Sequence, residues 1–217
     1  RLAHKTQETI EQARELWGEV GRENLFIKVP ATLAGLPAIE LLISEGISIN
    51  VTLIFSTERY EKVLNAYVSG IEKRIAGGAD VSQIQSVASF FVSRVDTAID
   101  PVLDLMGTNE TASLKGKAAV ANAHLAYEIF LKFSRSDRWK KLEISGAWPQ
   151  RLLWASTGVK DPKYAKDKYV TELAAPLTVN TMPEATLRAV HELNSTIKDS
   201  ISNEIANAHK VLQDLSN

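Results

Sequence analysis

The sequence has no cysteine, no excess of charge of either sign and no long apolar run. Without cysteine the chain has neither disulfide bonds nor thiolate metal ligands, and this fits a reducing compartment, so we expect a cytoplasmic protein. The 25 Lys and Arg residues balance 26 Asp and Glu residues, which gives no overall field to attract nucleic acid or an anionic membrane. No apolar run approaches the ~18 residues of a membrane-spanning helix. We therefore expect no nucleic-acid partner and no membrane partner.

Nucleotide-binding motifs are also missing, since no GxGxxG or Walker-type sequence follows an apolar segment. Short apolar segments instead alternate with helical patterns along the chain. The segments that read as strands are residues 24–30, 48–55, 86–95, 151–157 and 177–182. The helical patterns cover residues 5–20, 37–45, 57–76, 101–106 and 162–175, and a further one starts at Pro183. This alternation predicts a parallel sheet covered by helices.

Polar residues within these strands favour a barrel over a doubly wound sheet. In SINVTLIF, Asn50 and Thr52 share one parity, and the apolar residues share the other, namely Ile49, Val51, Leu53 and Phe55. Barrel strands turn one side to the helices and the other to the lumen. We therefore predict a TIM-type (β/α)8 barrel, formed by a single partial domain over residues 1–217. Residues 112–145 are predicted to be a helical insertion after the third strand.

Lys28 is the one charge in the apolar segment 24–30. A buried charged amine is costly, and burial favours the neutral amine, which is a nucleophile. A neutral amine condenses with a ketone to an iminium, which withdraws electrons while a carbon–carbon bond breaks. The alternative is a lysine that extends to solvent from a strand end, and the pattern alone favours this alternative.

Several ordered segments resemble the transaldolase family. They are IKVPATLAGLPAI, GISINVTLIFS and VASFFVSRVD. Four segments are similar in sequence to the longer bacterial branch of the family, namely NVTLIFS, SFFVSRVDT, WASTGVKDP and VNTMPEATL. The resemblance runs from about residue 1 to about residue 190. It implies a class I aldolase-like barrel and transfer of a dihydroxyacetone unit from a ketose phosphate to an aldose phosphate, through a lysine Schiff base, in the pentose phosphate pathway. It also implies sugar-phosphate partners and no metal or organic cofactor.

Two other functions remain open beside this resemblance. One is a related lysine-dependent sugar-phosphate aldolase that releases the three-carbon unit. The other is an inactive sugar-phosphate-binding fragment. The motifs give no signal for an oligomeric state.

By the resemblance, Lys28 matches the Schiff-base lysine, and Asn50 and Thr52 match the polar pair that positions the intermediate and a catalytic water. Ser89 matches the serine that contacts the bound sugar, and Phe91 matches the aromatic ring beside the water. Read without the family, Asn50 and Thr52 are more often satisfied polar groups of a sheet, and Phe91 is more often core.

Arg94 matches the phosphate-binding arginine of the family and is predicted at the C-terminal end of its strand, where barrel enzymes build their sites. An ion pair with Asp96 or Asp100 is the alternative. Ser156 matches a second phosphate contact.

The family's commoner pattern has an arginine two residues beyond this serine, where the present chain has Gly158. Lys160 is the candidate substitute, and a solvated loop charge is its alternative. The four histidines have no ligand-like spacing, and we expect them on helix surfaces.

The family mechanism also uses an aspartate from the first strand and a glutamate from the third. The strands found in this sequence resemble the fourth to the eighth, so about five of eight strands are present. We therefore expect a fragment of a longer parent that is inactive or aggregation-prone by itself.

Overall fold

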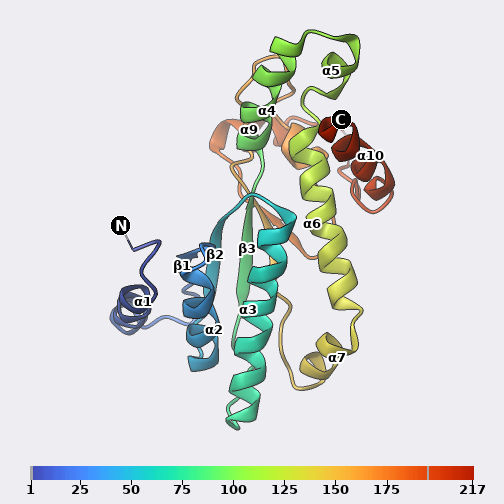
Figure 1. Ribbon diagram of the computed structural model, residues 1–217. Helices are drawn as coiled ribbons and strands as arrows, with labels where there is room; N and C mark the ends of the chain where they lie inside the picture. Colours follow the sequence, from blue (N-terminus) through green and yellow to red (C-terminus); the bar gives the residue numbers. More distant parts are fainter. Residues whose placement is uncertain (1, 195) are drawn as a thin grey trace. The chain divides into compact units, whose positions relative to one another are not determined.

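The computed structural model describes residues 2–194 and 196–217 (Figure 1). They form two compact units. The first unit contains the chain up to Ile54 together with Glu58–Ser89 and Phe130–Arg151. The second contains Phe55–Thr57, Phe90–Ile129 and Leu152–Asn217.

Residues 2–194 and 196–217 contain five strands, where five were predicted. They are β1 Ile27–Pro30, β2 Ile49–Ile54, β3 Ser86–Phe91, β4 Arg151–Ala155 and β5 Thr178–Asn180, and their order in the sheet is β1-β2-β3-β4-β5. β1 and β2 are parallel, and so are β4 and β5. Strands that neighbour one another in sequence order, separated by helices, are the arrangement of a (β/α)8 barrel. The predicted α/β class with a partial, unclosed barrel sheet is confirmed.

Four helices belong wholly or largely to the first unit. They are α1 Thr6–Val20, α2 Gly35–Glu45, α3 Thr57–Ala76 and α7 Asp137–Ile144. α1 contacts β1, and α2 contacts both β1 and β2. α2 begins two residues before Pro37, because a proline in the first helical turn has no amide whose partner is lost. Gly70 of α3 lies against α2, where an added Cβ would come within 2.7 Å of Ile43 Cβ and of the Glu40 carbonyl oxygen. Only glycine permits this approach of the two helices.

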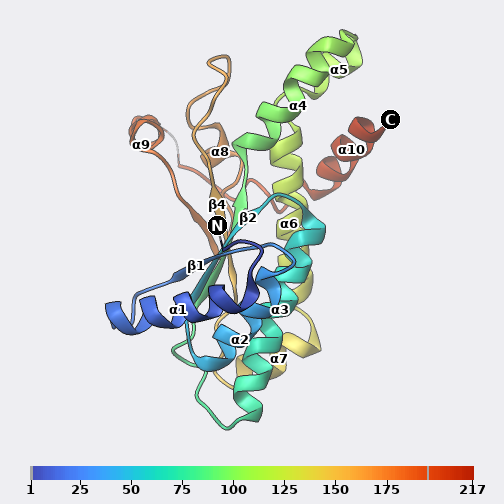
Figure 2. The same ribbon diagram turned by 60° about the vertical axis from the view of Figure 1, so that its left-hand side comes forward.

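Helices of the second unit differ more from the sequence prediction. They are α4 Ser93–Met106, α5 Asn109–Leu114, α8 Lys168–Thr171, α9 Glu184–His191 and α10 Ile205–Ser216, with most of α6 Ala118–Ser134. The helix predicted over 162–175 is reduced to α8, and α4 starts within the segment predicted as strand. α10 was not anticipated, and it packs on α4 to α6 through a cluster of Leu103, Leu114, Ala121, Ala208 and Val211 (Figures 1 and 2).

Helices α5, α6 and α7 occupy most of residues 112–145. That they are an insertion, and that the whole chain is one barrel domain, stays a prediction. Every helix in the described part of the chain is too short or too polar to cross a membrane.

Candidate active site

Three residues predicted for the site share one face of the sheet in the first unit. Lys28 on β1 is paired with Asn50 on β2, and paired residues of a parallel sheet project to the same side. Ser89 on β3 donates a hydrogen bond from Oγ to Asn50 Oδ1 at 2.7 Å. In the described part of the chain the Asn50 Nδ2 group has no partner. Lys28 thus projects to the same face as an amide that is fixed on one side and free to donate on the other.

The enclosed Lys28 that the Schiff-base role implies is not found in the described chain, where its side chain is exposed. Its neighbours Ile27 and Val29 project to the opposite face and are buried. β1 is the outermost strand in the sheet order, so no described strand covers the far side of Lys28. Enclosure of an amine at a sheet edge needs a further layer of protein on that side.

Thr52 is buried beneath this face, and its hydroxyl has no hydrogen-bond partner in the described part of the chain. A buried hydroxyl without a partner is costly, so it is a candidate to bind a water or a ligand group. The next residue, Leu53, has a left-handed φ of 62° and is 45% exposed. The predicted strict alternation therefore stops at Thr52, since Leu53 does not join the buried face of Ile49 and Val51.

Phe91 and Arg94 form a stacked group in the second unit. The Phe91 ring lies 5.2 Å from the Phe55 ring, and the Arg94 guanidinium carbon lies 5.3 Å from the centre of the Phe91 ring. Arg94 is exposed and lies in the first turn of α4, whereas the sequence predicted it at the end of the strand. The strand ends at Phe91, so Arg94 is three residues beyond it. An aromatic face beneath a guanidinium orients it while its donors stay available.

Ser156 follows β4 directly and has a left-handed φ of 57°. Its Oγ lies 3.1 Å from Ser93 Oγ, and its carbonyl oxygen accepts a hydrogen bond from the Ser93 amide at 3.0 Å. Ser93 is 1% exposed. The sequence patterns assigned no role to Ser93. The available signal was a small polar residue directly before Arg94 in VSRVD.

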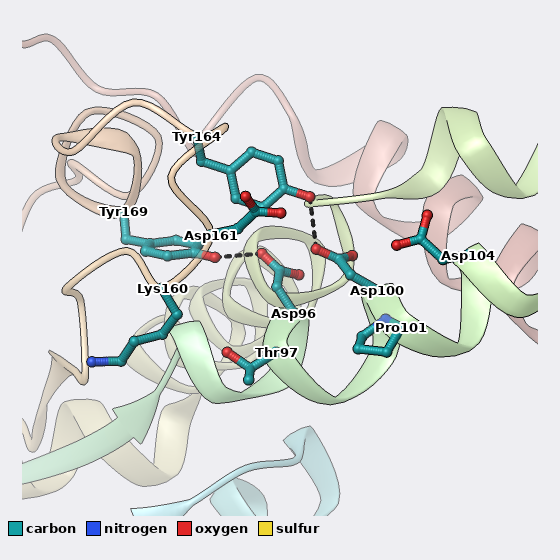
Figure 3. A pocket seen from close by; sticks show the side chains of 9 residues that line it. All are labelled: Asp96, Thr97, Asp100, Pro101, Asp104, Lys160, Asp161, Tyr164 and Tyr169. Atoms are coloured by element: carbon teal, nitrogen blue, oxygen red, sulfur yellow. Dashed lines mark hydrogen bonds between the residues drawn. The ribbon is translucent and has the colours of Figure 1, made fainter.

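Lys160 lines a pocket of about 230 Å³ in the second unit (Figure 3). Its other lining residues are mostly acidic or aromatic and are Asp96, Thr97, Asp100, Pro101, Asp104, Asp161, Tyr164 and Tyr169. Neither Arg94 nor Ser156 lines this pocket. In Figure 3 the Lys160 side chain extends away from the carboxylates of Asp96 and Asp100. The pocket therefore does not join Lys160 to the other candidate phosphate contacts.

Asp96 and Asp100 are buried carboxylates that hold the loop after β4. Tyr169 donates to Asp96 at 2.7 Å and Tyr164 donates to Asp100 at 2.6 Å (Figure 3). The ion-pair alternative for Arg94 is thus not realised in the described part of the chain.

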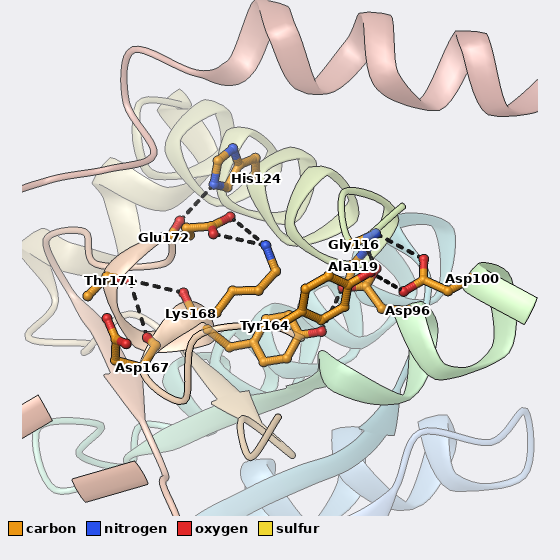
Figure 4. Close-up of polar contacts among 11 residues, drawn as sticks. Asp96, Asp100, Gly116, Ala119, His124, Tyr164, Asp167, Lys168, Thr171 and Glu172 are labelled. Atoms are coloured by element: carbon orange, nitrogen blue, oxygen red, sulfur yellow. Dashed lines mark hydrogen bonds and ion pairs between the residues drawn. The ribbon is translucent and has the colours of Figure 1, made fainter. Parts of the chain in front are cut away.

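The second oxygen of each carboxylate accepts from the backbone at the start of α6. The Ala119 amide donates to Asp96 at 2.7 Å, and the Gly116 amide donates to Asp100 at 2.9 Å (Figure 4). Burial raises the pKa of Asp96, and its hydrogen bonds to Tyr169 and Ala119 oppose that rise. These acids join three parts of the second unit, namely α4, the turn into α6 with its first residues, and α8 with the segment before it.

His124 is 5% exposed on α6, so the prediction of a helix-surface histidine is wrong for this residue. Its Nε2 lies 2.9 Å from the Glu172 carbonyl oxygen (Figure 4). A carbonyl oxygen only accepts, so Nε2 carries the proton. Burial lowers the pKa of His124 below its ordinary value, and the hydrogen bond to the Glu172 carbonyl opposes that change. The structure gives this residue a packing role.

Comparison with known proteins adds independent information. The family model described as transaldolase/fructose-6-phosphate aldolase matches residues 1–217. The chain is 55% identical over 216 residues to a transaldolase of Mycolicibacterium smegmatis and 54% identical over 216 residues to one of Mycobacterium tuberculosis. It is 56% identical over 215 residues to a transaldolase of Renibacterium salmoninarum.

These matches cover 99–100% of the chain but 58% of each relative. The chain thus spans somewhat more than half the length of the curated relatives it matches. A match along all of the chain, at more than half identity, agrees with the parallel sheet and with the residues found on its strands. The chain belongs to the transaldolase/fructose-6-phosphate aldolase family.

Proposed function

We propose that the protein is a transaldolase, which transfers a dihydroxyacetone unit from a ketose phosphate to an aldose phosphate through a Schiff base on Lys28. The observation that carries the proposal is the pairing of Lys28 with Asn50, together with the hydrogen bond from Ser89 to Asn50. Family membership and the transaldolase names of the relatives support the same reaction.

The reaction begins when the neutral Lys28 amine adds to the ketose carbonyl. Loss of water gives an iminium. The bond between the carbons α and β to the iminium carbon then breaks, its electron pair moves toward the iminium nitrogen, and the β-hydroxyl loses its proton to the surrounding water as it becomes the aldehyde of the leaving aldose. The aldose leaves and an enamine remains on Lys28. The enamine carbon then attacks the aldehyde of the acceptor, and water releases the new ketose and restores the amine.

Asn50 and Thr52 serve this sequence by binding its polar groups. Because Ser89 occupies Asn50 Oδ1, the Asn50 Nδ2 group is available to donate to a substrate hydroxyl. The Thr52 hydroxyl, which lacks a described partner, is suited to hold the water of iminium formation and hydrolysis.

The phosphate group is assigned to Arg94 and Ser156, with Lys160 as a further candidate. The stacking of the Arg94 guanidinium on Phe91 leaves a forked cation, which matches the geometry of phosphate oxygens. Ser156 adds a hydroxyl donor. Lys160 has weaker support, since it lines a pocket rich in carboxylates.

Borohydride trapping tests the proposal in the protein at its natural length. Incubation with fructose 6-phosphate and borohydride, followed by peptide mass spectrometry, is expected to place a reduced three-carbon adduct on Lys28 and none on Lys28→Ala. Lys73, a surface lysine of α3, supplies the matched Lys73→Ala control, which keeps the adduct. Trapping that persists in Lys28→Ala refutes the assignment.

The family name also includes fructose-6-phosphate aldolase, which favours one second candidate. Such an enzyme releases the three-carbon unit without an acceptor. Donor consumption measured with and without an aldose-phosphate acceptor separates the two reactions. Strong dependence on the acceptor supports transfer, and equal rates support simple cleavage.

A further inference from the structure

Ser93 and Ser156 are joined by two contacts in the second unit. The Ser93 amide donates to the Ser156 carbonyl oxygen at 3.0 Å, and the two hydroxyl oxygens lie 3.1 Å apart. The amide contact continues the ladder beyond the strands, because the Val92 amide donates to the Ala155 carbonyl oxygen at 3.0 Å. Ser93 thus fixes the residue that follows β4 through both its backbone and its side chain.

Ser156 needs such support because its backbone is unusual. Its φ of 57° lies in the left-handed region, which a non-glycine residue adopts only when its surroundings hold it there. Its side chain is half-buried, whereas that of Ser93 is 1% exposed. Solvent or substrate therefore reaches the Ser156 hydroxyl but not the Ser93 hydroxyl.

We propose that Ser93 is a positioning residue for phosphate recognition and sets the direction of the Ser156 hydroxyl proton. A phosphate dianion only accepts hydrogen bonds, so Ser156 must donate its proton to bind it. Ser156 Oγ is the partner of Ser93 Oγ in the described part of the chain. Either hydroxyl can donate in this contact, and when Ser156 donates to a phosphate, Ser93 becomes the donor to Ser156 Oγ.

The two hydroxyls form a short chain in which each donor strengthens the next. Arg94 follows Ser93 directly and places a guanidinium on the exposed side of the same helical turn. Ser93 acts on the substrate only through Ser156, so its loss weakens phosphate binding without changing the carbon–carbon chemistry. This inference rests on the proposed function, because it takes Ser156 as a phosphate contact.

The test compares Ser93→Ala with wild type in the protein at its natural length, using fructose 6-phosphate and unphosphorylated fructose as donors. We expect KM for fructose 6-phosphate to rise about 5- to 10-fold, the effect of one hydrogen bond, with kcat within two-fold. Kinetics with fructose should be unchanged. Ser93→Thr keeps a hydroxyl and should recover most of the affinity, and Ser93→Gly replaces Ser93→Ala if the latter does not fold.

Ser86→Ala is the matched control. Ser86 is also a buried serine, and its Oγ donates to the carbonyl oxygen of Ile49 on the neighbouring strand β2 at 2.7 Å. It should leave the ratio of the two KM values unchanged. An unchanged KM for fructose 6-phosphate in Ser93→Ala, or an equal rise for both donors, overturns the positioning role. Ser156→Ala separates failure of the Ser93 inference from failure of the proposed phosphate site. If Ser156→Ala also leaves KM for fructose 6-phosphate unchanged, the proposed phosphate site itself is wrong.

Discussion

Tyr169→Phe removes a hydroxyl that is buried against a buried carboxylate. The Tyr169 hydroxyl donates to Asp96 Oδ2 at 2.7 Å, and the two residues are 1% and 2% exposed. Phenylalanine keeps the ring and leaves no sizeable cavity, so the change isolates the hydrogen bond. One Asp96 oxygen then has no donor, while the other keeps the Ala119 amide.

The expected cost follows from the nature of the bond. Hydrogen bonds to charged groups contribute roughly 1.5–3 kcal/mol, and an unsatisfied buried acceptor cannot recover this from water. We expect the free energy of unfolding to fall by about 2 kcal/mol. For a domain of this size, that corresponds to a Tm lower by roughly 4–8 °C. The pKa of Asp96 should rise further, because the Tyr169 hydrogen bond opposes the effect of burial.

Urea unfolding followed by tryptophan fluorescence measures this effect. Trp154 is a suitable probe, since its Nε1 donates to the Leu173 carbonyl oxygen at 2.8 Å, close to α8. A double-mutant cycle with Asp96→Asn gives the coupling energy, which should exceed about 1 kcal/mol.

Tyr164→Phe is the matched control, because Tyr164 makes the equivalent bond to Asp100 from a half-buried position that water can reach. It should cost less than about 1 kcal/mol. The reasoning fails if Tyr169→Phe costs no more than Tyr164→Phe, or if the Tyr169 and Asp96 substitutions are additive.

Three further predictions concern stability. The pKa of His124 is lowered from 6.5 by burial, so its contribution to folding stability is present above about pH 6.5 and is lost as pH falls through the folded pKa. In His124→Gln, the free energy of unfolding in urea should therefore vary less between about pH 7 and 5. The pKa of Asp96 is raised from 3.8, so its contribution to folding stability is present below that value and is lost as pH rises through the folded pKa. Asp96→Asn should remove this pH dependence of the free energy of unfolding, which is opposite in sign to that of His124, and an unaltered pH dependence would refute the prediction. Gly70→Ala should cost about 1–3 kcal/mol in thermal unfolding by forcing α2 and α3 apart. Gly18→Ala in α1 meets nothing within 4 Å and should stabilise by about 0.5–1 kcal/mol, so similar effects at both glycines would contradict the packing argument.

The sheet could be predicted because each strand carries its own apolar signal between turn residues. The helix over 57–76 was also predicted with the bounds of α3. The end of β3 could not be predicted from the sequence. The segment SVASFFVSRV remains apolar through Val95, but the chain turns into α4 at Ser93. Hydrogen bonds from Val92 to the last residue of β4 and from Ser93 to the residue after it determine that turn, and they join residues about 60 positions apart.

The candidate site was predicted by motif, and the structure adds geometry that the motif does not carry. Pattern alone favoured a Lys28 that extends to solvent, whereas the Schiff-base role implied an enclosed one, because enclosure depends on what lies beyond β1. His124 was misplaced for a similar reason, since its ring contacts the Glu172 carbonyl oxygen just after α8, a contact distant in sequence. The catalytic and binding roles of the site residues stay predictions until the substitutions above are measured.

Asp96 and Asp100 lie one turn apart on α4, and they receive tyrosines that lie five residues apart. Two fixed spacings must therefore agree, one set by helical pitch and the other by the chain between Tyr164 and Tyr169. Related proteins should accept insertions or deletions ahead of Tyr164 but not inside that five-residue interval. A change of one residue there would break the hydrogen bond between one of the two tyrosines and its aspartate.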